Sequence, residues 1–251
     1  MRLTVLGVGA VRPNPRGATS GYLLESGGHA YLVDCGFGVL AQLLAVMSPA
    51  KLDGIFISHT HPDHCSDLVA VRMALVHAPG PRLSDPIPVY ALEESIADLE
   101  RLGRVYAEDF WVDVLSFVPV SADTVLRAQG LEVEFAPTLH FRSCLAMRFT
   151  GDGRSIAYTA DSGPSDALAQ LVQGSDLLLS EATLDERREE EEQWGHMTAS
   201  EAGELAAGCG VGRLVLTHYF AEYGLERLRR AAADAFGGPV VIAREGDVYE
   251  L

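Results

Sequence analysis

The chain has 251 residues, of which 48% are hydrophobic, and it carries a formal net charge of −16 at pH 7. This size allows one large domain or two small ones with a sizeable core, while the acidic balance argues against tight binding of a long nucleic acid through a basic face. The negative charge does not exclude a small anionic substrate, because a bound metal ion would supply positive charge locally.

The first half of the chain begins with strand-like runs and then alternates helices and strands. An apolar run at 2–9 precedes a loop rich in Pro, Arg and Gly at 11–21, and two apolar runs with a glycine turn between them predict a hairpin at 22–36. The later segments alternate in pattern: a helix at 39–47, a strand at 51–59, a helix at 67–78, a strand at 86–92 and a helix with an acidic start at 94–107.

The second half repeats this order. Its predicted elements are hairpin-like segments at 124–140 and 143–162, a helix at 166–174, a strand at 176–182, a helix at 198–210, a strand at 212–219, a helix at 224–236 and strand-like pieces at the end. No linker separates the halves, so we expect one α/β domain over 1–251, with two sheets packed face to face and helices outside. The acidic run at 185–193 is expected to be a solvated loop or helix face.

The cysteine pattern and the absence of long apolar runs indicate the cellular compartment of the protein. The four cysteines are scattered and form no CxxC pair. The N-terminus lacks the regions of a signal peptide, and no apolar run is long enough for a membrane span. We therefore expect a cytoplasmic protein with reduced thiols and no membrane partner. Cys65 is expected to be a structural thiol and Trp111 a core residue.

The segment SHTHPDHCSD at 58–67 concentrates residues that bind metals. His59, His61, Asp63 and His64 fall within six residues, directly after a buried strand. Residues i and i+2 of an extended segment face the same way, so His59 and His61 should point together. Imidazole and carboxylate groups suit Zn²⁺, Mn²⁺ or Fe²⁺. The segment therefore predicts a metal site, with enough ligands to serve two adjacent ions.

Four more polar residues each end an apolar run: Asp34, His140, Asp161 and His218. A single aspartate in such a place can simply terminate a strand. Together with the histidine cluster, however, these strand ends indicate one shared site.

These motifs resemble those of the metallo-β-lactamase-fold hydrolase superfamily over essentially the whole chain. The resemblance implies a four-layer αβ/βα sandwich made of two similar halves. It also implies two divalent ions, zinc ahead of manganese or iron. The implied ligands are His59, His61 and His140 for one ion, Asp63, His64 and His218 for the other, and Asp161 between them. Asp34 would brace the metal loop. The nucleophile would be a metal-bridging hydroxide that Asp63 orients or deprotonates.

Three segments indicate which branch of this superfamily the chain resembles. The opening at 6–24, SEAT at 180–183 and GHMTASEAGELA at 195–206 resemble ribonuclease Z. The resemblance implies that His196 contacts the scissile phosphate and that Glu181 orients it. A leaving alkoxide benefits from such a proton donor. Alternatively, His196 is a surface residue before a helix capped by Thr198, and Glu181 is a strand-end carboxylate.

The chain departs from ribonuclease Z in two places. Ser180 replaces the first histidine of the corresponding HEAT motif, and the interval from His140 to Asp161 has room for only one hairpin, not for the tRNA-binding arm. In length, in motif spacing and in the absence of the arm, the chain resembles short bacterial cyclic nucleotide phosphodiesterases. We therefore expect a dinuclear phosphodiesterase for a small substrate such as 3′,5′-cyclic AMP.

Several alternatives stay open. The same metal core would serve a nuclease on short RNA, or a lactonase or thioesterase that cleaves carbon esters. A non-catalytic metal scaffold is disfavoured by the complete ligand set. Arg16 and Arg142 are candidates for phosphate binding or for solvated loop positions. A homodimer is possible by analogy with the family.

Overall fold

The computed structural model describes residues 1–77, 83–187 and 195–251 of the chain. Its strands form two mixed sheets of seven strands each. The first sheet has the order β14 (Val248–Glu250), β1 (Arg2–Gly7), β2 (Gly21–Ser26), β3 (His29–Val33), β4 (Gly54–Phe56), β5 (Ile87–Ala91) and β6 (Leu115–Pro119). The second has the order β13 (Val240–Ile242), β12 (Leu214–Thr217), β11 (Leu177–Glu181), β10 (Arg154–Tyr158), β9 (Leu145–Gly151), β8 (Leu131–Pro137) and β7 (Val125–Ala128).

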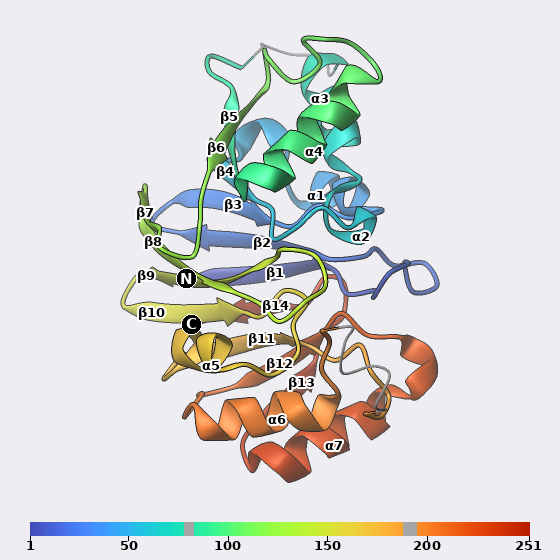
Figure 1. Cartoon of the computed structure of the whole chain (residues 1–251), viewed down its shortest axis with the longest axis vertical. Helices are drawn as coiled ribbons and strands as arrows, with labels where there is room; N and C mark the ends of the chain where they lie inside the picture. The colour runs from blue at the N-terminus through green and yellow to red at the C-terminus, as the bar shows by residue number, and fades with distance from the viewer. Residues whose placement is uncertain (78–82, 188–194) are drawn as a thin grey trace.

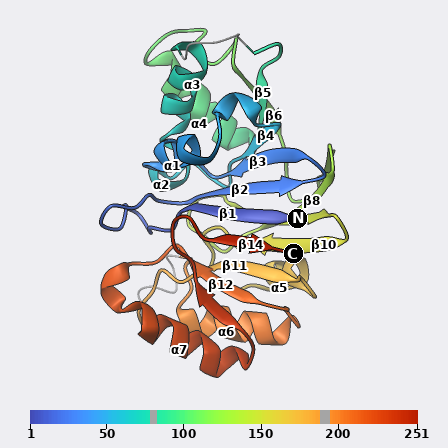
Figure 2. The same ribbon diagram turned by 180° about the vertical axis from the view of Figure 1, so that it is seen from behind.

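Helices cover the outer faces of both sheets, as Figures 1 and 2 show from opposite sides. The first sheet carries α1 (Val39–Val46), α2 (Pro62–Cys65), α3 (Leu68–His77) and α4 (Glu93–Arg104). The second carries α5 (Asp166–Val172), α6 (Ala199–Gly208) and α7 (Leu225–Phe236). Short 3₁₀ helices occupy Pro49–Lys51 and Ala221–Tyr223. This arrangement confirms the predicted four-layer αβ/βα sandwich.

The two halves share one plan. In each sheet the strands that come first in the chain pair antiparallel, and the later ones pair parallel because helices connect them. The repetition is broken at the C-terminus, where β14 leaves the second half and pairs antiparallel with β1. The amide of Leu251 donates to the carbonyl of Met1 at 3.0 Å, so the two ends lie side by side (Figures 1 and 2).

Aromatic rings join the sheets across the core. Phe56 on β4 packs 5.4 Å from Phe149 and 6.4 Å from Phe135, both of the second sheet, and Tyr22 on β2 packs 5.2 Å from Tyr158 on β10. These side chains are almost completely buried. Removing so much apolar surface from water is the main source of stability for the face-to-face packing.

Some elements differ from the prediction. The strand expected at 51–59 is only three residues long, because a 3₁₀ helix precedes it and the chain leaves the sheet at Ile57 towards the histidine segment. The edge strand β6 was not predicted, since its run LSFVP is short and ends at Pro119. The acidic run was predicted at 185–193, and residues 188–193 of it lie outside the described residues. Within the described part of the chain, no helix is long and apolar enough to cross a membrane.

Candidate metal centre

The site forms where several strands of both sheets end. Asp34 follows β3 and His218 follows β12, and both have left-handed backbone angles, with φ of 56° and 46°. Ala160, just before Asp161, has φ of 49°. Such angles are costly for residues other than glycine and persist where the surrounding structure enforces them. They turn the chain sharply after the strand, so that the polar side chains point into one site.

The structure brings all seven predicted metal ligands together in two adjoining groups. One group holds His59, His61, His140 and Asp161, and another holds Asp63, His64 and His218; a third grouping places His196 with Asp161 and His218. Asp161 adjoins both, because its carboxylate oxygens lie 3.6 Å from His59 Nε2 and 3.2 Å from His64 Nε2.

Four of the five histidines present Nε2 to this centre, because a neighbouring group occupies Nδ1. These pairs are His59 with Ser58 Oγ at 3.0 Å, His64 with Asp34 Oδ2 at 2.8 Å, His140 with the Gly195 carbonyl at 3.2 Å and His218 with Thr183 Oγ1 at 2.8 Å. The two hydroxyls donate their own hydrogens elsewhere, to Asp34 and to the His218 carbonyl, so they accept from the rings. These contacts orient the rings so that Nε2 faces the centre, where it can bind a metal.

His61 has the opposite orientation. Its Nδ1 lies 3.0 Å from His59 Nε2 and 3.2 Å from His140 Nε2. Burial lowers the pKa of His59 far below its usual value, and it lowers the pKa of His61 to about 4. Burial also lowers the pKa of His140. These three rings are therefore neutral near pH 7, which is the form that binds a metal.

The Asp161 carboxylate supplies the clearest sign that cations belong here. Its Oδ1 atom is buried and accepts no hydrogen bond, although His64 Nε2 and His218 Nδ1 lie only 3.2 and 3.4 Å away. A buried carboxylate oxygen without a donor is unfavourable unless a cation compensates it. Imidazole and carboxylate ligands suit zinc, manganese or iron, so the residues fit divalent ions.

Asp34 is the centre of a buried network that supports His64. Besides the His64 ring, it accepts hydrogen bonds from the Ser58 amide at 2.8 Å, the Ser58 hydroxyl at 2.9 Å and the Tyr158 hydroxyl at 2.8 Å. A carboxylate behind a histidine orients the ring and raises its basicity. Sequence reasoning found Asp34 but assigned no role to Ser58, Tyr158 or Thr183. Ser58 directly precedes His59 and Thr183 ends SEAT, whereas Tyr158 lies in an apolar strand without any signal.

We expect the Tyr158→Phe variant to be less stable by about 1.5 kcal/mol, because it loses a hydrogen bond to a buried carboxylate. Urea unfolding of the metal-free protein measures this change. Tyr90→Phe is the control, since Tyr90 is a half-buried tyrosine whose ring stacks on Phe56. Equal midpoints for Tyr158→Phe and the wild type would contradict the predicted network.

His196 and Glu181 form a buried pair at the edge of the cluster. His196 Nδ1 lies 3.0 Å from Glu181 Oε1, and the His196 ring lies 5.0 Å from the His140 ring. Glu181 also accepts from the amides of Ser162 and Met197 at 2.6 and 3.2 Å, which fixes its carboxylate. Burial lowers the pKa of His196, but the Glu181 carboxylate outweighs it and raises the pKa to about 9.

The loop that carries His196 is anchored by the helix after it. The Thr198 hydroxyl accepts from the Glu201 amide at 3.2 Å, and the Glu201 carboxylate accepts from the Thr198 amide at 2.8 Å. This capping box begins α6 as the sequence indicated.

The remaining candidates occupy defined places. The Val11 amide donates to Asp63 Oδ2 at 2.7 Å, so the loop after β1 borders the site. Arg16 is exposed. Arg142 donates to Thr60 at 3.0 Å and to Asp98, so it is held beside α4. Cys65 and Trp111 are buried, as predicted.

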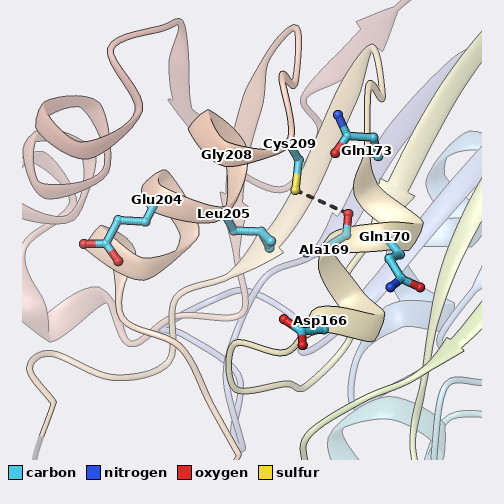
Figure 3. Close-up of a pocket in the computed structure, with 8 residues that line it drawn as sticks. All are labelled: Asp166, Ala169, Gln170, Gln173, Glu204, Leu205, Gly208 and Cys209. Carbon is cyan, nitrogen blue, oxygen red and sulfur yellow. Dashed lines mark hydrogen bonds between the residues drawn. The ribbon is translucent and has the colours of Figure 1, made fainter.

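A hollow that is separate from these residues lies between α5 and α6. Its volume is about 540 Å³, and Figure 3 shows its lining, including Asp166, Glu204 and Cys209. The Cys209 thiol donates to the Ala169 carbonyl at 3.3 Å. Since none of its lining residues is a histidine or a member of the cluster, this hollow offers no comparable chemistry.

Known proteins are similar to this chain in sequence and in fold. The profile of the beta-lactamase superfamily domain matches residues 13–219. The chain is 34% identical to the probable metallo-hydrolase YhfI of Bacillus subtilis over the full length of both, and the crystal structure of YhfI superimposes with a TM-score of 0.89 over 99% of this chain and 98% of that one. It is 29% identical to ribonuclease Z of Mycobacterium tuberculosis over 98% of this chain and 96% of that one. The short form of human tRNase Z, 24% identical, has the same fold, with a TM-score of 0.79 over 100% of this chain and 99% of that one.

Proposed function

The chain belongs to the beta-lactamase superfamily as a metal-dependent hydrolase, and from this premise we propose that it is a phosphodiesterase that cleaves a small cyclic nucleotide such as 3′,5′-cyclic AMP. The observation that carries the proposal is the pair of His196 and Glu181 beside the His140 ring. Cleavage of a phosphodiester expels an alkoxide, which needs a proton. A histidine held by a buried carboxylate can supply one.

We propose that the cluster holds two divalent cations, with zinc ahead of manganese or iron. His59, His61 and His140 would hold one, Asp63, His64 and His218 the other, and Asp161 would lie between them, as their grouping supports. Two such ions, when bound, activate water and offset the charge of a phosphodiester.

Three side chains of the protein would have separate roles in the reaction. Asp63 would orient the attacking water or take its proton, and its Oδ2 is itself held 3.2 Å from His218 Nε2. His196 would contact the phosphate and protonate the leaving oxygen, and its raised pKa supports a protonated ring near neutral pH. Glu181 would keep that ring in place.

The connection between His140 and Asp161 supports a small substrate. It contains only a short loop and the hairpin of β9 and β10, so it has no length for the arm that ribonuclease Z carries there. The net charge of −16 also disfavours a long polyanion. The site of a cyclic nucleotide needs neither feature.

A nuclease acting on RNA is the second candidate, because relatives at 29% identity carry the name ribonuclease Z. A carbon-ester hydrolase would use the same cluster but would have no need for His196. These alternatives differ from our proposal in the substrate and in the role of His196.

Product analysis tests the proposal. Protein loaded with Zn²⁺ or Mn²⁺ is incubated with 3′,5′-cyclic AMP, a short RNA and a lactone. We expect 5′- or 3′-AMP from the wild type and none from His61→Ala, while His29→Ala serves as a control outside the cluster. Protein that demonstrably holds two metals yet leaves cyclic AMP intact would rule out this substrate and favour RNA or carbon esters, whichever is cleaved.

We also propose that residues 1–251 act as one domain, which the core shared by both sheets supports. A cytoplasmic location and a homodimer stay predictions.

A further inference from the structure

A polar pocket of about 380 Å³ lies next to the candidate metal centre. One wall comes from the segments that carry the metal-ligating histidines, with Thr60 between His59 and His61, and with Phe141 directly after His140. The opposite wall comes from α4, with Ser95 and Asp98. A substrate whose phosphate sits at the cluster therefore has this pocket within reach.

Phe141 is the unusual residue of this pocket. Its side chain is 69% exposed, although it is a large apolar group. Its ring lies 4.9 Å from the His61 ring and 4.5 Å from the His140 ring, so one side is fixed against the cluster. An exposed aromatic ring at a site mouth offers a surface on which a flat base can stack.

Hydrogen bonds to Asp98 connect the polar residues of the pocket wall. Its carboxylate accepts hydrogen bonds from Thr60 at 3.1 Å, from Arg101 at 2.9 Å and from Arg142. Arg142 Nε donates to Thr60 at 3.0 Å. Asp98 offsets the charge of Arg142, which disfavours the phosphate-binding role considered from the sequence.

The pocket thus combines one aromatic face with a set of donors and acceptors that carries little net charge. The exposed Ser143 adds a hydroxyl group to the guanidinium and carboxylate groups. A heterocyclic base has the matching features, because it has a flat face and an edge with both donors and acceptors. An aliphatic ester substituent would use neither.

We propose that this pocket binds the nucleobase of the substrate, with the base stacked on Phe141 and its polar edge towards Asp98, Arg142 and Ser143. This subsite rests on the proposed phosphodiesterase function, because the phosphate at the metal cluster places the base. It makes Phe141 a residue that determines specificity for nucleotides over other phosphoesters.

Calorimetric titration of the metal-loaded protein tests the subsite without turnover. The two probes are AMP and its base-free counterpart, ribose 5-phosphate. We expect the wild type to bind AMP about 10-fold more tightly, the scale of one base stacked on an aromatic ring. Phe141→Ala should lose this preference and Phe141→Tyr should keep it. Tyr106→Ala, which removes an exposed aromatic residue that does not line the pocket, should keep it too.

Two results would overturn the subsite: a wild type without preference for AMP, or a preference that survives in Phe141→Ala. Failure of the proposed function is a different result, in which cyclic AMP is not hydrolysed while the Phe141-dependent preference for AMP persists. Weaker binding of both probes to Phe141→Ala would also count against the subsite, since it would assign Phe141 to supporting His61 and His140.

Discussion

Replacing Asp161 with asparagine is expected to lower hydrolysis by at least about 10³-fold, the scale of losing a group central to catalysis, together with most of the bound metal. The two carboxylate oxygens of Asp161 lie next to histidines of both groups, 3.6 Å from His59 and 3.2 Å from His64. An amide has the same shape but no charge, so two cations placed on either side of it would lose the anion that offsets their repulsion.

Metal content per chain, measured by inductively coupled plasma mass spectrometry, is the direct test, with the rate on the best substrate beside it. Asp123→Asn makes the same chemical change at an exposed aspartate in the turn before β7 and should leave both quantities unchanged. An Asp161→Asn protein with full metal content and an undiminished rate would remove Asp161 from the proposed centre.

His196→Ala is expected to lower kcat for a phosphodiester by roughly 10²- to 10³-fold, the usual size of a general-acid contribution, while metal content stays the same. The side chain lies beside the cluster and is held by Glu181 at 3.0 Å, and in our proposal it is not one of the residues that hold the ions. His77→Ala at the exposed end of α3 is the matched control. If His196→Ala turns over a phosphodiester at the wild-type rate, the proton donor lies elsewhere.

The pH profile separates a proton donor from a merely structural residue. Burial alone would lower the pKa of His196, and Glu181 raises it to about 9. The acid form is active in our proposal, so activity should fall as pH rises through that pKa. Glu181→Gln removes the charge that raises the pKa, so its alkaline fall-off should begin at lower pH than in the wild type. An unchanged profile in a folded Glu181→Gln protein would contradict this assignment.

Local sequence patterns predicted most of the fold. Apolar runs and glycine turns located the hairpins and outer helices, because these depend on near neighbours. The edge strand β6 was missed, since five residues ending in a proline carry little periodic signal. The pairing of β14 with β1 could not be read from either segment, because it joins opposite ends of the chain.

The proximity of the candidate ligands was predicted to a similar degree. The spacing of His59, His61 and Asp63 indicates a metal site by itself. The strand-end positions of His140 and His218, together with the resemblance to the superfamily, brought them into the same set. The hydrogen bonds that support the candidate ligands could not be predicted from the sequence. Tyr158 reads as an ordinary core residue of β10, and only the packed structure places its hydroxyl on Asp34.

The C-terminal strand β14 pairs with β1 in the first half, and this pairing has a consequence for protein synthesis. The open edge of β1 receives its partner from roughly 240 residues further along the chain, which at ribosomal speeds of about 5–20 residues per second means a delay on the order of 10–50 s. Throughout that interval the nascent N-terminal sheet exposes unpaired backbone groups, which attract other strands. Translation speed and chaperone access should therefore influence the yield of this protein more than they would if each half completed its own sheet.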